Sequence, residues 1–224
     1  MEIVELHGVR LPITPNVVDP FIAEQFRSGR YEHFEIAGLN SQLRAGDRVL
    51  DLGACHGLTS TFAARTRGVR AVMAVEASPR ILPHLRTTYA LNEVTVDLRH
   101  GLVIGGEATG AAPFYVRPRN WNSSVFGKND AAAEKVTVPT LGINALMAEF
   151  KPTVLSCDIE GGEYDVLPGA HLDTVRAIII ELHPKRFGAE KTAALLEGLA
   201  KQGFVRVPDI GTAVKHVYCR ADPS

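Results

Sequence analysis

The sequence predicts an α/β protein with a doubly wound, mostly parallel β-sheet and one antiparallel edge strand. Segments with strand and helix patterns alternate along most of the chain. The segment 69–77, VRAVMAVEA, is apolar without alternation, which is typical of a parallel strand covered on both faces. The last apolar segment, 212–220, is expected to supply the antiparallel strand.

Local signals place the elements in order. A short strand pair surrounds His7-Gly8, Gly68 closes one helix, and Ser78-Pro79 begins the next. Pro83 lies early enough in that helix to be tolerated. The expected helices cover 18–28, 32–43, 58–68, 78–92 and 141–150. The other expected strands cover 48–52, 69–77, 94–100, 153–161, 176–184 and 203–209, with a hairpin of 113–116 and 134–140.

The composition is that of an ordinary globular domain. The 224 residues carry 24 Lys and Arg against 25 Asp and Glu, so a nucleic-acid or membrane partner is not indicated. No linker or long apolar run appears, and we expect one domain over 1–224, with a cap of residues 1–44 on a core of residues 45–224. Three cysteines without CxxC spacing, Cys55, Cys157 and Cys219, favour a reducing, cytoplasmic compartment.

The stretch DLGACHG, residues 51–57, places an acid and two glycines after the first core strand. Gly53 permits a sharp turn and a close backbone approach to a ligand. The helix N-terminus that follows favours a carboxylate or a phosphate. The spacing from Gly53 to Gly57 lacks the GxGxxG pattern of a dinucleotide site, which disfavours an NAD-dependent oxidoreductase.

Glu76 ends the apolar strand 25 positions after Asp51. An acid at this place can accept hydrogen bonds from the ribose hydroxyls of a nucleoside. Adenosine at Glu76, with an amino-acid group near Asp51 and Gly53, matches S-adenosylmethionine, which needs no pyrophosphate site. The alternative, that Glu76 is a surface acid, is unusual at the end of a fully apolar strand.

Three further segments are more specific: GRYEHFE at 29–35, LSCDIEGGEYDVLPGA at 155–170 and AIIIELHP at 177–184. Together with DLGACHG and VEASP, they resemble the FkbM-type S-adenosylmethionine-dependent methyltransferases from about residue 29 to residue 184. The resemblance implies a class I methyltransferase fold. It also implies methyl transfer, commonly to a hydroxyl of a sugar, polyketide or other small metabolite.

The resemblance also assigns site residues. Those expected to bind the cofactor are Tyr31, Asp51, Gly53, Ala54, Gly57, Glu76, Ala77, Ser78 and Asp158. Cys55 and His56 stand where the family often has Asn and an apolar residue, and Ala77 replaces a frequent Pro. These departures leave the acid and the glycines of the turn in place.

The residues expected to be catalytic follow two later strands: Asp158, Glu160, Glu181 and His183. In a doubly wound sheet these strand ends lie together over the cofactor. A hydroxyl acceptor must lose a proton, so His183 or Asp158 would act as general base. In the other version, Asp158, Glu181 and His183 hold a divalent metal such as Mg²⁺, which lowers the pKa of the acceptor.

Glu160 and His183 also have simpler interpretations, as do two acids that follow Glu160. Glu160 would cap the next helix, Glu163 and Asp165 would be helix-dipole partners, and His183 would be a structural hydrogen-bonding group. The remaining histidines are expected to be solitary: His56, His84, His100, His171 and His216.

The polar loop 116–130 is either a lid over the acceptor or a plain hairpin tip. Arg117 and Arg119 in it would favour an acidic or phosphorylated acceptor. Two other activities stay open: methyl transfer to nitrogen or to a carboxyl group, and non-catalytic nucleoside binding. The sequence indicates no oligomeric state.

Overall fold

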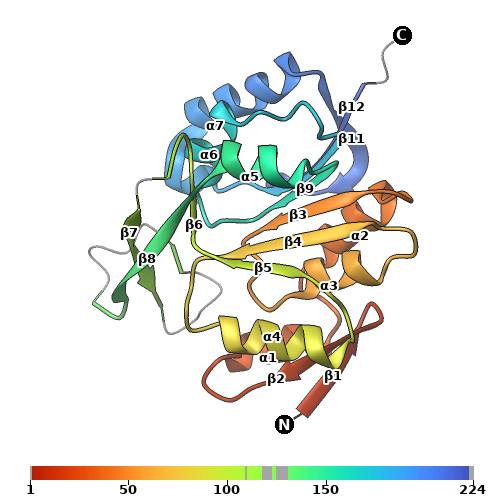
Figure 1. Cartoon of the computed structure of the whole chain (residues 1–224), viewed down its shortest axis with the longest axis vertical. Helices are drawn as coiled ribbons and strands as arrows, with labels where there is room; N and C mark the ends of the chain where they lie inside the picture. Colours follow the sequence, from red (N-terminus) through yellow and green to blue (C-terminus); the bar gives the residue numbers. More distant parts are fainter. Residues whose placement is uncertain (1, 109, 118–122, 125–130, 222–224) are drawn as a thin grey trace.

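Figure 1 shows the chain in a computed structural model, which describes residues 2–108, 110–117, 123–124 and 131–221. The strands are β1 (Glu2–Leu6), β2 (Val9–Ile13), β3 (Arg48–Leu52), β4 (Ala71–Glu76), β5 (Asp97–His100), β6 (Leu102–Ile104), β7 (Ala111–Val116), β8 (Glu134–Gly142), β9 (Val154–Cys157), β10 (Ala177–Glu181), β11 (Phe204–Gly211) and β12 (Lys215–Arg220). The helices are α1 (Pro20–Arg27), α2 (His33–Gln42), α3 (Leu58–Arg65), α4 (Leu82–Leu91), α5 (Ile143–Phe150), α6 (Glu163–Val166) and α7 (Pro184–Lys201), with a 3₁₀ turn η2 (Leu167–Gly169).

The central sheet orders its seven described strands as β11-β12-β10-β9-β3-β4-β5. The five strands from β10 to β5 are parallel, and β12 is antiparallel to both of its neighbours. The predicted doubly wound, mostly parallel sheet is confirmed. The antiparallel strand lies one position inside the edge, because the β11–β12 hairpin inserts its second strand beside β10. The strand order reverses between β3 and β9, where such sheets bind ligands.

Alternate residues of the central strands fill two separate cores. Leu50, Met73 and Ile178 pack with α5, α6 and α7 on one face. Val49 and Val72 pack with the N-terminal elements, α2 and α3 on the other. Figure 1 shows helices on both sides of the sheet, with β1, β2, α1 and α4 below β5. The alternation holds the strand ends between two helical layers, which positions the residues that follow each strand.

Helix α2 lies very close to the sheet. A Cβ on Gly38 would lie 2.8 Å from the side chain of Val217 and 3.1 Å from that of Ile179. Glycine at this position therefore lets the helix backbone approach β10 and β12. The approach brings the N-terminal residues of α2 toward the carboxyl end of β10.

A second, three-stranded sheet stands beside the carboxyl ends of β4 and β5, in the order β6-β8-β7. β7 and β8 pair antiparallel, which confirms the expected hairpin. The three-residue strand β6 was not predicted, and it pairs parallel with β8. Among the described residues, no helix is both long enough and apolar enough to cross a membrane.

Candidate active site

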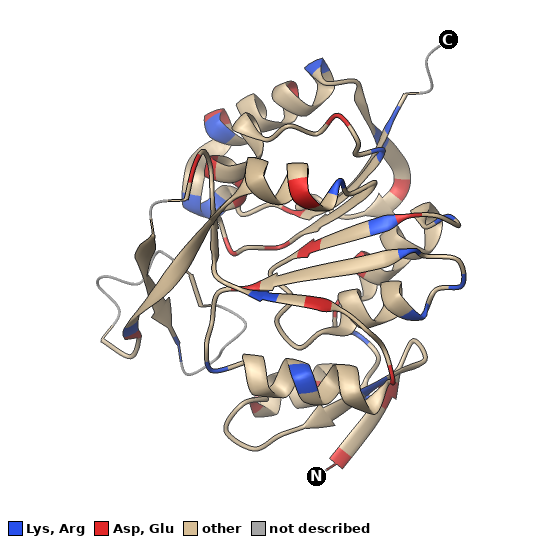
Figure 2. Ribbon diagram, viewed as in Figure 1, with Lys and Arg blue, Asp and Glu red and all other residues tan. Residues whose placement is uncertain are grey.

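A cavity of about 430 Å³ opens at the carboxyl ends of β3, β4 and β9. Figure 2 shows acidic segments of ribbon at the ends of β3 and β4 that face the β7–β8 hairpin. The walls of the cavity combine glycines, apolar side chains and a few acids. They are formed by Gly53, Cys55, Val75, Glu76, Ala77, Ile81, residues 101–106, Phe114, Ser123, Asp158, Ile159, Glu160, Gly162, Asp165, Val166 and Gly169.

Glu76 is anchored by the backbone at one side of this cavity. Its Oε2 accepts a hydrogen bond from the Cys55 N–H at 3.0 Å, and its Oε1 accepts one from the Ser78 N–H at 2.6 Å. Burial raises the pKa of Glu76, and these backbone hydrogen bonds oppose the rise. Each carboxylate oxygen keeps a second lone pair, so the fixed carboxylate can still accept a bond from a ligand hydroxyl.

Gly53 brings the end of β3 against the end of β9. Its φ is +87°, and a Cβ there would lie 1.8 Å from the carbonyl oxygen of Asp158. Glycine is therefore required by the protein's own backbone. We expected glycine here because the backbone would approach the ligand closely. In the structure the close neighbour is instead the carbonyl oxygen of Asp158.

Four predicted cofactor residues line the cavity: Gly53, Glu76, Ala77 and Asp158. The other five are absent from its walls: Tyr31, Asp51, Ala54, Gly57 and Ser78. Asp51 is buried and accepts a hydrogen bond from the Thr59 hydroxyl at 2.9 Å. Gly57 is the N-cap of α3, and a Cβ there would lie 2.9 Å from the Leu85 side chain. Asp51 and Gly57 therefore pack against the protein side of the turn.

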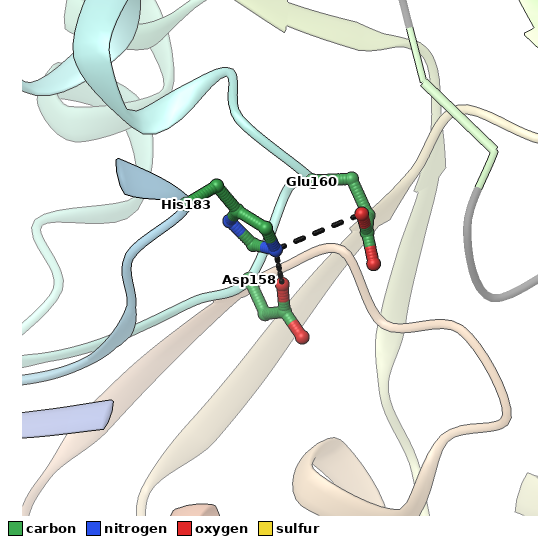
Figure 3. Close-up of side chains that lie close together, drawn as sticks. All are labelled: Asp158, Glu160 and His183. Carbon is green, nitrogen blue, oxygen red and sulfur yellow. Dashed lines mark ion pairs between the residues drawn. The ribbon is translucent and has the colours of Figure 1, made fainter. Parts of the chain in front are cut away.

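His183 faces the carboxylates of Asp158 and Glu160, as Figure 3 shows. Its Nε2 lies 3.6 Å from Oε2 of Glu160 and 3.9 Å from Oδ1 of Asp158. Asp158 and Glu160 follow β9, and His183 follows β10, so adjacent parallel strands supply the group. Oδ1 of Asp158 is buried and has no hydrogen-bond partner among the residues that the structure describes.

Glu163 holds the other side of the same imidazole. Its side chain is fully buried, and Oε1 lies 3.1 Å from Nδ1 of His183. The same Oε1 accepts hydrogen bonds from the N–H groups of Ile159 and Gly161 at 3.2 Å each. Glu163 lies in the first turn of α6, as expected for a helix-dipole partner, and its side chain also points inward onto His183.

Glu160 does not cap the next helix, contrary to that simpler interpretation. The N-cap of α6 is Gly162, which has no side-chain cap hydrogen bond. The carboxylate of Glu160 instead accepts a hydrogen bond from Arg186 at 3.1 Å. Glu160 therefore belongs to the His183 group.

Glu181 does not lie in the group of ligand atoms around His183. It pairs with Lys215, and Lys215 also pairs with Glu35 of α2. Among the described residues, the atoms close enough to share a metal ion belong to Asp158, Glu160 and His183, all within 4.8 Å of one another. The expected metal-binding trio was Asp158, Glu181 and His183. In the structure Glu160 takes the place of Glu181 in this group.

The acids alter each other's protonation. Burial, followed by the charges of Glu181 and Glu160, raises the pKa of Asp158 well above its usual value. For His183, burial lowers the pKa, but the hydrogen bond and charge of Glu163 outweigh burial and raise it. The site therefore holds several carboxyl groups with few positive partners, and a cationic ligand would favour their ionised forms.

Two other expectations concern residues outside this group. His56 and His84 are not solitary: His56 Nδ1 lies 3.3 Å from His84 Nε2, and both rings are buried. Most of the loop 116–130 lies outside the described residues, including Arg119 and Trp121. Arg117 is described, and its N–H donates to the Ser123 hydroxyl at 3.0 Å.

The doubly wound sheet, the glycine turn after β3 and the acid at the end of β4 are those of a class I S-adenosylmethionine-dependent methyltransferase. The sequence matches the family described as "Methyltransferase FkbM domain" over residues 51–206, and the chain belongs to this family. The predicted family, fold class and enzyme class are thus confirmed. A comparison with curated protein sequences found no significant match.

Several solved structures are similar in fold. The ribosomal protein L11 methylase of Lactobacillus delbrueckii subsp. bulgaricus is 13% identical, with a TM-score of 0.48, over 86% of this chain and 80% of that one. The precorrin-6y C5,15-methyltransferase of Geobacter metallireducens GS-15 is 10% identical, with a TM-score of 0.49, over 85% and 87%. Aeropyrum pernix fibrillarin with bound S-adenosyl-L-methionine is 12% identical, with a TM-score of 0.48, over 83% and 72%.

Proposed function

We propose that this enzyme transfers the methyl group of S-adenosylmethionine to a hydroxyl of a small metabolite, with His183 as general base. The observation that supports this most is the placement of the imidazole. Nε2 faces the cavity-lining acids Asp158 and Glu160, while Nδ1 is held by the buried Glu163. Because Nδ1 is hydrogen-bonded to Glu163, Nε2 is the nitrogen that can accept a proton.

The residues present fit the cofactor. Glu76 offers an anchored carboxylate for the ribose hydroxyls, and the buried acids suit a ligand with a positive charge. The cofactor supplies an electrophilic methyl group when bound. The chain then has to align the acceptor oxygen with that methyl group and remove its proton.

His183 performs the second task in this proposal. As the acceptor hydroxyl attacks, neutral Nε2 takes its proton, and the charges of Glu160 and Glu163 stabilise the imidazolium that forms. The cavity of about 430 Å³ has the size of a small-molecule site, which favours a metabolite as acceptor. Three free cysteines, Cys55, Cys157 and Cys219, support a cytoplasmic location for the enzyme.

The test measures release of S-adenosylhomocysteine with a panel of sugars and polyketides, each paired with its O-methyl ether. Turnover with the free hydroxyl and none with the ether would identify oxygen as the acceptor. His183→Ala should lower the transfer rate by about 10²-fold or more, while calorimetry shows unchanged S-adenosylhomocysteine binding. His171→Ala, at an exposed histidine, is the matched control.

Three outcomes contradict the proposal. Wild-type turnover in His183→Ala would remove His183 as base and leave positioning as the catalytic device. Loss of turnover with a chelator and recovery with Mg²⁺ or Mn²⁺ would replace the base with a metal held near Asp158. Turnover only with amines or carboxylates would favour N- or carboxyl-methylation, and binding without any turnover would favour a nucleoside-binding module.

A further inference from the structure

Several buried carboxylate oxygens around the cavity-lining residue Asp158 have no hydrogen-bond partner in the described part of the chain. They are Oε2 of Glu32, Oε2 of Glu35, Oδ1 of Asp158 and Oε2 of Glu163. Glu35 is only 5% exposed, and its other oxygen pairs with Lys215. Buried acceptors without donors are rare in folded proteins, because each costs free energy. The charge of Glu35 acts on both Glu32 and Asp158, and the charge of Glu163 acts on Asp158, so the four acids lie close together. This proximity indicates that hydrogen-bond donors arrive with a ligand.

Glu32 is the member of this group with the least usual backbone. It precedes α2 with φ at +47°, in the left-handed region that a residue with a side chain adopts at a cost. Its side chain makes no capping hydrogen bond to the helix. The strained backbone therefore serves to direct the carboxylate elsewhere.

The neighbours of Glu32 place it along the cofactor turn. Tyr31 interacts with the carboxylate of Glu32 and with the thiol of Cys55. Cys55 lines the cavity, and its N–H donates to Glu76 on the opposite side of the turn. Glu76, Cys55 and Glu32 thus form a series that begins at the ribose-binding acid. Glu32 is connected through Tyr31 to Cys55 of the cavity wall, and we expect the methionine portion of the cofactor on this side of the turn.

The charges around Glu32 favour a cation. Burial, followed by the charge of Glu35, raises the pKa of Glu32 to about 8, and Asp51 adds to the rise. Lys215 opposes it, but Lys215 is already paired with Glu35 and Glu181. A second positive group placed here would keep Glu32 ionised and relieve repulsion among the acids.

We propose that Glu32 binds the α-ammonium group of the cofactor's methionine portion, with Asp158 as a second acceptor. An ammonium group brings three N–H donors and one positive charge, which match unpartnered carboxylate oxygens. Glu76 then holds the ribose and Glu32 holds the amino acid at the other end. The proposal concerns the cofactor alone and does not depend on the identity of the acceptor.

The test compares two ligands by calorimetry on the whole chain. S-adenosylhomocysteine carries the amino acid, whereas 5′-methylthioadenosine has the same nucleoside and thioether without it. Glu32→Gln should weaken S-adenosylhomocysteine binding by about 10- to 100-fold and change 5′-methylthioadenosine binding less than about twofold. Glu24→Gln, at an exposed acid of α1, is the matched control and should change neither.

A second measurement uses the unmodified protein, in case Glu32→Gln does not fold. The desamino analogue of S-adenosylhomocysteine keeps the carboxylate and lacks the ammonium group, and it should bind about 10-fold or more weakly than the parent. Equal binding of the two would overturn the proposal. So would equal losses of both ligands in Glu32→Gln, which would show that Glu32 only supports the turn, or full S-adenosylhomocysteine affinity in that variant.

Discussion

His183 and Glu163 form a hydrogen-bonded pair, with Nδ1 of the imidazole 3.1 Å from Oε1 of the carboxylate. Backbone N–H groups of Ile159 and Gly161 fix the same carboxylate oxygen. Because an ionised carboxylate only accepts hydrogen bonds, the proton of the neutral imidazole resides on Nδ1. Nε2 is thereby left as an acceptor beside Asp158 and Glu160. The pair decides which nitrogen can take a proton.

Glu163→Gln is expected to lower kcat by about 10²-fold and to move the acidic limb of the rate–pH profile to lower pH. An amide does not fix the imidazole tautomer, and it removes a charge that raises the pKa of His183. Because the reaction needs neutral His183, activity falls below its pKa, and a lower pKa extends activity toward acid. The measurement is kcat between about pH 5 and 9.

The control for Glu163 is Glu190→Gln, at an exposed acid of α7. It should leave both kcat and the profile unchanged. A Glu163→Gln enzyme with lower kcat but an unmoved acidic limb would show that Glu163 acts on the fold and not through His183. Calorimetry with S-adenosylhomocysteine should find the same affinity in both variants.

Glu76→Ala should weaken S-adenosylhomocysteine binding by roughly 1.5–3 kcal/mol, the scale of a hydrogen bond to a charged group. The carboxylate is already fixed by the N–H groups of Cys55 and Ser78, so it meets the ribose in place. Calorimetry measures the change, and thermal unfolding checks that the turn persists. Unchanged affinity would mean that Glu76 serves only to close the turn.

Gly53→Ala should destabilise the protein more than the backbone conformation alone explains. A left-handed φ costs a residue with a side chain about 1–3 kcal/mol, and at Gly53 the new Cβ also meets the Asp158 carbonyl oxygen at 1.8 Å. Gly46→Ala is the matched control, since its φ is +91° and the space around its Cβ is empty. Urea unfolding should show a larger loss for Gly53→Ala. Equal losses in the two variants would refute a tight approach of β3 to β9.

The sequence predicted the features that depend on short spacing. The order of strands and helices followed from apolar runs and turn residues, as did Gly53 after β3 and Glu76 at the end of β4. The placement of Asp158 beside His183 followed from two strand ends that are neighbours in a doubly wound sheet. These inferences needed only the direction and order of the strands.

Pairings that depend on side-chain direction were not predicted. Glu163 was assigned to a helix dipole because its spacing from Gly162 fits a first helical turn, and no spacing shows that α6 directs it inward. Lys215, which pairs with Glu181, lies 34 residues later in the chain. His56 and His84 were judged solitary for the same reason, as 28 residues separate them. Such contacts depend on packing between elements and have no local pattern.

The His56–His84 pair should make stability depend on pH. Burial lowers the pKa of His84 from 6.5 to about 4, so the folded protein keeps it neutral while the unfolded chain binds a proton below pH 6.5. As pH falls through this window, unfolding takes up that proton, and the free energy of unfolding falls by about 1.4 kcal/mol per pH unit from this residue. Buried acids such as Glu32 titrate in the opposite sense, so the informative quantity is the difference between wild type and His84→Gln. Urea unfolding gives the free energy of unfolding of each protein. Between pH 6.5 and pH 4, the value for His84→Gln should rise by about 3 kcal/mol relative to the value for wild type. His171→Gln, at an exposed histidine, should follow wild type, and parallel curves for wild type and His84→Gln would show that His84 is protonated in the folded state.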